Sequence, residues 1–321
     1  MNWIVIAFFI ALIVAFATTP SVRRIAIRLN VLVHPGGRRV HTRPMPMWGG
    51  LAIFGAFAVA VLLLMTFAVH KPGAMMPIFG VIVSGMLILT FGMIDDMKEL
   101  SAPVQTVLIV ASAIVLMSFG VRIQILTNPF GHPAMIPIHG ALSWGLTLAW
   151  IFTITKTIDF MDGLDGLAAG IGAIASGVLA IMANHSGQTN VALMAGALCG
   201  ACVGFLRFNF NPAKIFMGTG GSQFIGFSLA AISIVGAFKM TAAIAIALPM
   251  LVFGVPIFDG FYVVVKRLTK GQPVSKADKS HLHHRLLDRG LTHRQAVIVI
   301  WTIMIILGFA ALALLWHSKV R

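Results

Sequence analysis

Residues 49–69, GGLAIFGAFAVAVLLLMTFAV, form an uncharged apolar stretch that is long enough to cross a membrane as one helix. About 20 consecutive apolar residues span the hydrocarbon core of a bilayer. Residues 295–316, QAVIVIWTIMIILGFAALALLW, have the same character, and 59% of the whole chain is apolar. A buried helix of a soluble protein would account for one such stretch but not for a series. The sequence therefore predicts an all-α polytopic membrane protein.

The apolar pattern predicts about ten transmembrane helices within a single integral-membrane domain, residues 1–321. The expected spans are 2–20, 49–69, 76–94, 103–120, 140–158, 167–183, 190–206, 223–238, 241–265 and 295–316. The first span lacks a basic start and an evident cleavage pattern, so we expect a retained helix rather than a signal peptide. Residues 121–139 contain three prolines, and we expect an external hairpin or loop there.

The basic residues are unevenly distributed between the two sets of loops. Most of the 23 lysines and arginines fall in one set, the loops at about 21–48, 95–102, 156–166, 207–222 and 266–294. The positive-inside rule makes these loops cytoplasmic and places the N-terminus outside. Such loops also bind anionic lipid headgroups, which accounts for the net charge of +14 without a nucleic-acid partner.

All nine acidic residues lie on this same face or at its membrane edge. Three of them, Asp159, Asp162 and Asp165, occur in TKTIDFMDGLDGLAAG (155–170), and Asp95 and Asp96 end an earlier span. Helix capping alone is the simpler explanation, but acids at membrane-span ends are costly and usually functional. Clustered carboxylates suit a hard divalent cation, so we expect Mg²⁺, with Mn²⁺ as the alternative. Together with the basic loops, they indicate metal-assisted phosphoryl chemistry.

Two further motifs belong to the same face. The segment HLHHRL (281–286) suits phosphate contact, with zinc binding and structural hydrogen bonding as alternatives. The segment FNFNPAKIFMGTGGSQF (208–224) combines polar residues with a glycine-rich turn before a helix, which attracts anions or simply permits a tight turn. The pair Cys199 and Cys202 lies inside an apolar span, where we expect small packing residues rather than a redox or zinc site.

In this order, the motifs resemble those of the polyprenyl-phosphate N-acetylhexosamine-1-phosphate transferases over nearly the whole chain. The matching segments are RRVHTRPMPMWGG, GMIDDMKEL, DFMDGLDGLAAG, FNFNPAKIFMGTGGS and ADKSHLHHRLLDRG. The resemblance implies transfer of a sugar-1-phosphate from a UDP-sugar to undecaprenyl phosphate or a related lipid, with release of UMP. It also implies a multi-pass protein of the bacterial inner membrane with a cytoplasmic active site. The HLHHRL form is closer to the N-acetylglucosamine-type branch than to the muramoyl-pentapeptide branch.

The resemblance also implies roles for individual residues. Asp95 or Asp96 would deprotonate or orient the lipid phosphate, and Asp162 and His281 complete the expected catalytic set. The expected metal ligands are Asp96, Asp159 and Asp162. The expected substrate contacts are Lys98, Asp159, Asp165, Asn209, Lys214, His283, His284 and Arg285. We favour direct attack by the lipid phosphate, although a phospho-aspartyl intermediate stays open, as does a homodimer.

Three positions depart from the family pattern. Asp159 replaces the usual Asn, Thr219 replaces a metal-binding Asp, and Trp48 replaces an Arg before the paired glycines. We hypothesise that the carboxylate gained at Asp159 compensates for the one lost at Thr219. A catalytically impaired relative acting as a scaffold is one alternative. A transporter of an anionic solute is the other.

Overall fold

The computed structural model describes residues 3–33, 44–69, 73–127, 135–237, 248, 250–271 and 280–319. Helices dominate this part of the chain, with two short strand pairs between them. The helices are α1 Trp3–Arg28, α2 Gly49–Ala68, α3 Met75–Lys98, α4 Ala102–Ser118, α5 Gly140–Phe160, α6 Leu167–His185, α7 Thr189–Asn209, α8 Gly218–Ala237, α10 Gly254–Thr269, α11 Leu282–Asp288 and α12 His293–Lys319. The strands are β1 Leu32–Val33, β2 Met45–Pro46, β3 Ile125–Thr127 and β4 Met135–Pro137.

Eight of the described helices are long and apolar enough to cross a membrane, which confirms a polytopic membrane protein. They are α1, α2, α3, α5, α6, α7, α8 and α12. The helix α4 is apolar but has only 17 residues, and α10 has 16. The total of ten spans stays a prediction, because residues 241–247 of the expected ninth span lie outside the described residues. So do residues 34–43 of the first motif.

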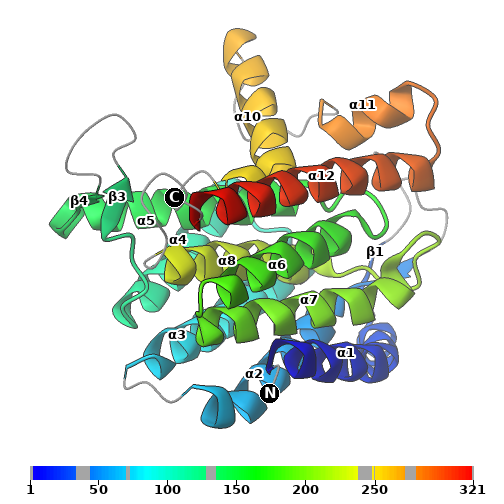
Figure 1. Ribbon diagram of the computed structural model, residues 1–321. Helices are drawn as coiled ribbons and strands as arrows, with labels where there is room; N and C mark the ends of the chain where they lie inside the picture. Colours follow the sequence, from blue (N-terminus) through cyan, green and yellow to red (C-terminus); the bar gives the residue numbers. More distant parts are fainter. Residues whose placement is uncertain are drawn as a thin grey trace.

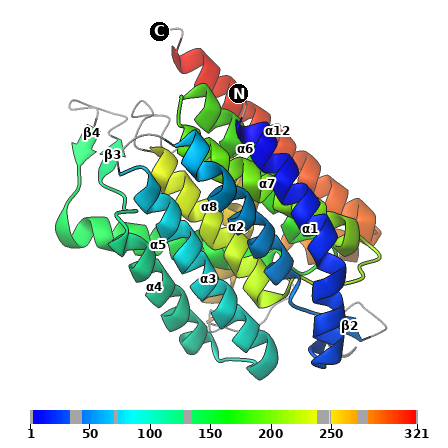
Figure 2. The ribbon, with the colours of Figure 1, turned by 90° about the horizontal axis from the view of Figure 1, so that it is seen from below.

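The helices form a bundle around α8, the most deeply buried of the spans (Figure 1). The helices α3 and α5 pack on α8, and α6 and α2 also contact it. The helix α7 lies between α1 and α6, and α2 contacts both α1 and α7 (Figure 2). The start of α1 and the end of α12 lie at the same end of the bundle as β3 and β4 (Figure 1). The segment β1 and the helix α11 lie at the opposite end, which carries the predicted motifs.

Small residues allow the closest helix contact, between α1 and α7. Ala7, Ala11 and Ala15 lie buried at four-residue intervals on α1. They face the matching stripe on α7, where a side chain at Gly200 would overlap the carbonyl oxygen of Phe8. Backbones that approach this closely gain dispersion contacts, which stabilise helix pairs inside a membrane. Cys202, on the same helix, is a buried free thiol that lies against Gly172 of α6.

Several boundaries differ from the sequence-based prediction. The helix α1 continues to Arg28, eight residues past the predicted span, and α8 begins at Gly218 rather than 223. Hydropathy marks only the apolar part of a helix, whereas the backbone hydrogen bonds continue into polar sequence. The hairpin expected at 121–139 is confirmed as the antiparallel pair β3–β4. The expected loop 266–294 contains the end of α10, all of α11 and the start of α12.

Candidate active site

The end of α3 is held against the start of α8 by two glycines in direct contact. A side chain at Gly92 would overlap the backbone of Gly220, so only glycine permits this approach. The contact brings Asp96 to the N-terminus of α8, where the Thr219 N–H donates to its Oδ1 over 2.7 Å. Unpaired N–H groups at a helix N-terminus favour negative charge. The Thr219 position therefore contributes a backbone donor to Asp96 instead of a second carboxylate.

The other carboxylate oxygen of Asp96 is buried without a hydrogen-bond partner. This Oδ2 lies against Gly218, which has a φ of 75° and where a side chain would occupy the same space. Buried polar oxygens are almost always hydrogen-bonded or bound to a cation. The oxygen is therefore available to a cation or a proton.

Asp95 has a different environment from its neighbour. Its Oδ1 accepts from the Leu100 N–H at 2.8 Å and from Gln105 Nε2 at 3.0 Å. These bonds fix the turn between α3 and α4. The Oδ1 of Asp95 is thus bound within the protein, whereas Asp96 is the member of the pair with a buried oxygen that has no hydrogen-bond partner.

Asp159 forms an ion pair in the middle of this end of the bundle. Lys156 Nζ lies 2.6 Å from Asp159 Oδ2, and Ser222 Oγ donates to Asp159 Oδ1 over 2.6 Å. Lys156 also donates to Gln105 Oε1 over 3.1 Å, which connects Asp159 to Asp95 through Gln105. Both carboxylate oxygens of Asp159 therefore already have partners within the protein.

Asp162 lies in the turn between α5 and α6, close to other carboxylates. Burial raises its pKa from the ordinary value of 3.8 to about 8, and repulsion from Asp159, Asp96 and Asp165 acts in the same direction. A carboxyl group in this setting is stabilised by a proton or by a bound cation. Asp162 and Asp96 are thus the two carboxyl groups of the site that would gain most from a cation.

Asp165 and Asn209 bind the protein rather than facing an open site. Asp165 Oδ2 accepts from Asn211 Nδ2 at 2.9 Å and from the Ala213 N–H at 3.0 Å. Asn209 Oδ1 accepts from the Gly166 N–H at 3.1 Å, and Asn209 Nδ2 donates to the Ile215 carbonyl at 3.0 Å. These bonds join the turn 161–166 to the segment 210–217. Both side chains thus shape this loop, and their expected contact with substrate stays a prediction.

The histidine motif reaches the aspartate turn through His283. This ring lies over Gly163, where a side chain would overlap its Nε2. Burial, with smaller contributions from the neighbouring His284 and His281, lowers the pKa of His283 from 6.5 to about 3. His283 is therefore neutral at physiological pH and is not a cationic phosphate ligand by itself.

His281 is oriented by an acid from another helix. Its Nδ1 lies 2.7 Å from Asp259 Oδ2 on α10, and the Leu282 N–H donates to Asp259 Oδ1 over 2.6 Å. The His281 and His283 rings are stacked, with 5.7 Å between their centroids. Arg285 lies over the Tyr262 ring at 4.9 Å. A carboxylate on one ring nitrogen fixes the tautomer and leaves the other nitrogen for substrate.

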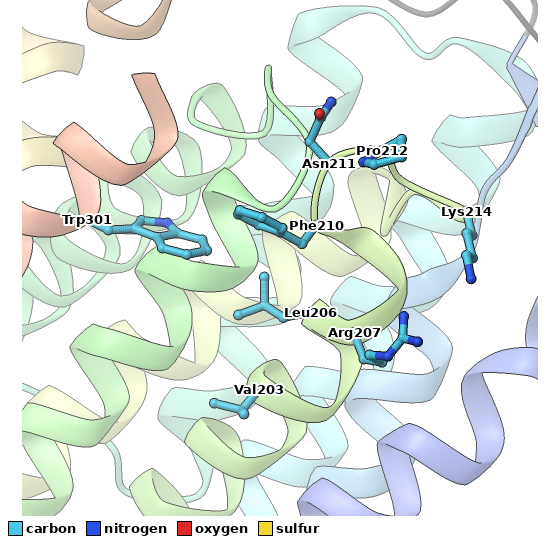
Figure 3. Close-up of a pocket in the computed structure, with 8 residues that line it drawn as sticks. All are labelled: Val203, Leu206, Arg207, Phe210, Asn211, Pro212, Lys214 and Trp301. Carbon is cyan, nitrogen blue, oxygen red and sulfur yellow. The ribbon is translucent and has the colours of Figure 1, made fainter. Parts of the chain in front are cut away.

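The two predicted lysines lie apart from each other. Lys98 is exposed in the last turn of α3, beside the acidic pair. Lys214 is exposed on the other side of the segment 210–217 and lines an open pocket with Arg207 and Trp301 (Figure 3). The structure therefore places Lys98 near the carboxylates and Lys214 at a separate surface.

Sequence reasoning missed three residues that organise the site. Lys156 could have been found from its i,i+3 spacing to Asp159 on one helix. Asp259 was noticed as an acid, but no pattern connected it to His281, 22 residues later. Gln105 carries no sequence signal, since it meets Lys156 only through the packing of α4 beside α5.

The three predicted metal ligands have different surroundings in the structure. Within the described ranges, no group of three or more His, Cys, Asp or Glu side chains gathers in an arrangement that could hold a metal. Of the expected trio Asp96, Asp159 and Asp162, Asp159 is bound by Lys156 and Ser222 in this structure, and the trio as a set of metal ligands stays a prediction. The unpartnered oxygen of Asp96 and the strongly basic carboxylate of Asp162 fit a cation that has further ligands from a phosphate.

The fold and site together define a class: a polytopic membrane protein with carboxylates, histidines and basic side chains at one end of its bundle. Comparison with known sequences gives the family. Residues 78–237 match the profile of glycosyl transferase family 4. Together with a relative that is 37% identical over 97% of the chain, this match shows that the chain belongs to glycosyl transferase family 4.

Several named proteins are similar over most of the chain. A probable undecaprenyl-phosphate N-acetylglucosaminyl 1-phosphate transferase of Bacillus subtilis (strain 168) is 37% identical over 97% of this chain and 85% of its own length. A decaprenyl-phosphate N-acetylglucosaminephosphotransferase of Mycobacterium tuberculosis (strain H37Rv) is 37% identical over 94% and 80%. The undecaprenyl-phosphate alpha-N-acetylglucosaminyl 1-phosphate transferase of Escherichia coli (strain K12) is 25% identical over 87% and 75%.

Proposed function

We propose that this protein transfers N-acetylglucosamine-1-phosphate from UDP-N-acetylglucosamine to a polyprenyl phosphate such as undecaprenyl phosphate, releasing UMP. The observation that carries the proposal is the near full-length identity of 37% to relatives named for this reaction. The site chemistry agrees with it, since unpartnered carboxyl oxygens and basic side chains at one end of a membrane bundle suit two phosphate substrates. The product is a lipid-diphosphate sugar, the first membrane intermediate for a cell-wall or surface polysaccharide.

In this reaction Asp96 and Asp162 would hold Mg²⁺ together with the diphosphate. A bound Mg²⁺ neutralises phosphate charge and stabilises the leaving phosphate. The Thr219 N–H holds Asp96 so that its Oδ2 faces Gly218, which fixes the direction of the free oxygen. Fixing this direction before substrate binds reduces the reorganisation needed during reaction.

The ion pair of Lys156 and Asp159 suggests how the chain works without an aspartate at position 219. The ammonium group of Lys156 is a positive charge that the protein itself places in the cluster of Asp159, Asp95 and Asp162. In this arrangement Asp159 holds the lysine and is not a direct metal ligand. Relative to the family pattern, the chain lacks an acid at position 219 and has an additional acid at position 159. The additional charge of Asp159 is balanced by Lys156.

His281 contacts the sugar diphosphate in this proposal. Asp259 accepts from its Nδ1 and keeps the other nitrogen directed at the substrate. The nearby Lys98 and Arg285 add positive charge for phosphate binding. Direct attack of the lipid phosphate on the β-phosphate needs only positioning and charge neutralisation, which these groups supply.

The orientation in the membrane is also part of the proposal. We place the carboxylates and histidines at the cytoplasmic face of the bacterial inner membrane, because the loops at that end carry most of the lysines and arginines. Ten spans would put both termini outside.

Release of labelled UMP tests the proposal. The purified protein receives UDP-N-acetylglucosamine, undecaprenyl phosphate and Mg²⁺, and other UDP-sugars serve as a panel for specificity. We expect UMP release that depends on the lipid phosphate and is lost in Asp96→Asn and Asp162→Asn. A correctly folded protein that releases no UMP from any UDP-sugar contradicts the proposal and favours a scaffold or a transporter.

A further inference from the structure

An open cavity of about 570 Å³ lies on the outside of the bundle, between the end of α7 and the start of α12 (Figure 3). Its wall is apolar and is formed by Val203, Leu206, Phe210 and Trp301. The Phe210 and Trp301 rings are 5.6 Å apart, and the Trp301 N–H donates to the Leu167 carbonyl at 3.3 Å. The aromatic part of the wall is therefore fixed by the contact of Trp301 with α6.

The opposite side of the cavity is cationic. Arg207 and Lys214 line it, and both are exposed (Figure 3). Among the residues that the structure describes, neither side chain pairs with a carboxylate. Two cations without acidic partners beside an apolar wall are complementary to an amphiphile with an anionic head.

Two further arginines strengthen the positive charge at this rim. Arg23 from α1 donates to the Lys214 carbonyl, and Arg294 from α12 donates to the Asn211 carbonyl, both over 3.0 Å. Both arginines are exposed and use only part of their donor capacity in these bonds. The carboxylate nearest to this segment, Asp165, already accepts from Asn211 and Ala213.

The cavity is distinct from the carboxylate site. Asp96, Asp159 and Asp162 belong to α3, α5 and the turn after α5, whereas the cavity is lined by α7, α12 and the segment 210–214. That segment separates the two, with Asp165 bound to one side and the cavity on the other.

We propose that this cavity binds an acidic glycerophospholipid, with one acyl chain against Trp301 and Phe210 and the phosphate between Arg207 and Lys214. Val203, which lines the cavity, is an exposed apolar residue, as expected for a surface that faces lipid. A phospholipid bound here holds the segment 210–214, and through Asp165 it stabilises the turn that carries Asp162. Anionic lipid thereby supports the geometry of the site from outside it.

Quenching of tryptophan emission by brominated lipid tests this binding. The full-length protein in neutral detergent micelles is titrated with phosphatidylglycerol or phosphatidylcholine, each brominated on one acyl chain. We expect phosphatidylglycerol to quench more strongly at low lipid fraction, and Trp301→Phe to remove that difference. In Arg207→Gln/Lys214→Gln we expect the lipid fraction for half-maximal quenching to rise about tenfold.

The matched control is Arg24→Gln/Arg28→Gln, which removes two exposed charges of α1 that do not line the cavity. This control should shift the half-maximal fraction less than twofold. Equal quenching by the two lipids, an equal shift in the control, or no quenching of Trp301 by either lipid overturns the proposal. Displacement of phosphatidylglycerol by equimolar undecaprenyl phosphate also overturns it, because the cavity would then bind substrate. Unchanged elution and emission maxima show that the variants are folded.

Discussion

The ammonium group of Lys156 lies 2.6 Å from Oδ2 of Asp159, so the chain places its own cation within its cluster of carboxylates. The two side chains are largely buried, at 17% and 14% exposure, and Ser222 and Gln105 bind the outer atoms of the pair. A partly buried pair with additional hydrogen bonds is costly to break from one side only.

A double-mutant cycle measures the Lys156–Asp159 pair. We expect Lys156→Gln and Asp159→Asn each to lower the free energy of unfolding by about 2 kcal/mol, since each leaves a charge without its partner. The double variant should recover about half of the summed loss, because neither charge is then unpaired. Chemical unfolding in detergent gives the numbers. Strict additivity of the two losses would mean that the pair does not interact.

Mg²⁺ titration separates the two roles considered for Asp159. If Asp159 acts as a partner of Lys156, the Asp159→Asn variant has lower activity, but its Mg²⁺ concentration for half-maximal activity stays within about threefold of the parent's. As a metal ligand, its loss would raise that concentration tenfold or more, and Thr219→Asp would restore it. Full Mg²⁺-dependent activity in Asp159→Asn would exclude any compensating role for this carboxylate.

The pKa of about 8 for Asp162 predicts a pH-dependent response to metal. In the folded state Asp162 retains a proton that it loses near pH 3.8 in the unfolded state. Without metal, the free energy of unfolding therefore falls as the pH rises from about 4 to about 8. His283 has a lowered pKa and adds stability with rising pH only below 6.5, so this histidine does not contribute between pH 6.5 and 8.5. Thermal unfolding with EDTA at pH 6.5 and 8.5 measures the loss.

Mg²⁺ should restore the stability lost at pH 8.5, because it replaces the proton on Asp162. In Asp162→Asn both the pH dependence above 6.5 and the Mg²⁺ effect should shrink. Asp288→Asn, an exposed acid on α11, is the control and should behave like the parent. An unchanged pH response in Asp162→Asn would place the titration elsewhere.

The Asp259–His281 contact predicts a positioning effect on turnover. Asp259→Asn retains the Leu282 contact but presents an amide to His281 Nδ1, so we expect kcat to fall about tenfold or more with a smaller change in KM. The pH profile of kcat should shift, since the ring loses its carboxylate partner. If Asp259→Asn lowers activity as much in a His281→Gln background as in the parent, Asp259 does not act through His281.

The contact of α1 with α7 predicts strong sensitivity at Gly200. A valine there would overlap the Phe8 carbonyl and separate the helices, so we expect loss of folded protein in detergent, read by monodisperse elution. Gly55→Ala on α2 is the control, because nothing lies within 4 Å of an added carbon there. Normal recovery of Gly200→Val would show that this helix contact tolerates wider spacing.

Much of the architecture was accessible from the sequence because membrane helices are marked by uninterrupted apolar runs. The spans of α2 and α3 and the hairpin β3–β4 agree with the predicted ranges to within a few residues. The start of α8 was misplaced because Gly218–Ser222 read as a loop. Those glycines are instead the first helical turn, packed on Gly50 and Gly92.

The sequence alone determined that this is a polytopic membrane protein with its acids near its basic loops, because hydropathy and charge are local properties. The tertiary structure decided which acids remain available. Asp159 is bound by Lys156 and Ser222. Asp165 is bound by Asn211 and Ala213. Asp96 keeps one buried oxygen without a hydrogen-bond partner. These assignments depend on contacts between helices remote in sequence, set by close approaches such as Gly92 on Gly220. No pattern along the chain encodes such distances, so packing divided the predicted ligands into those that hold the fold and those left for chemistry.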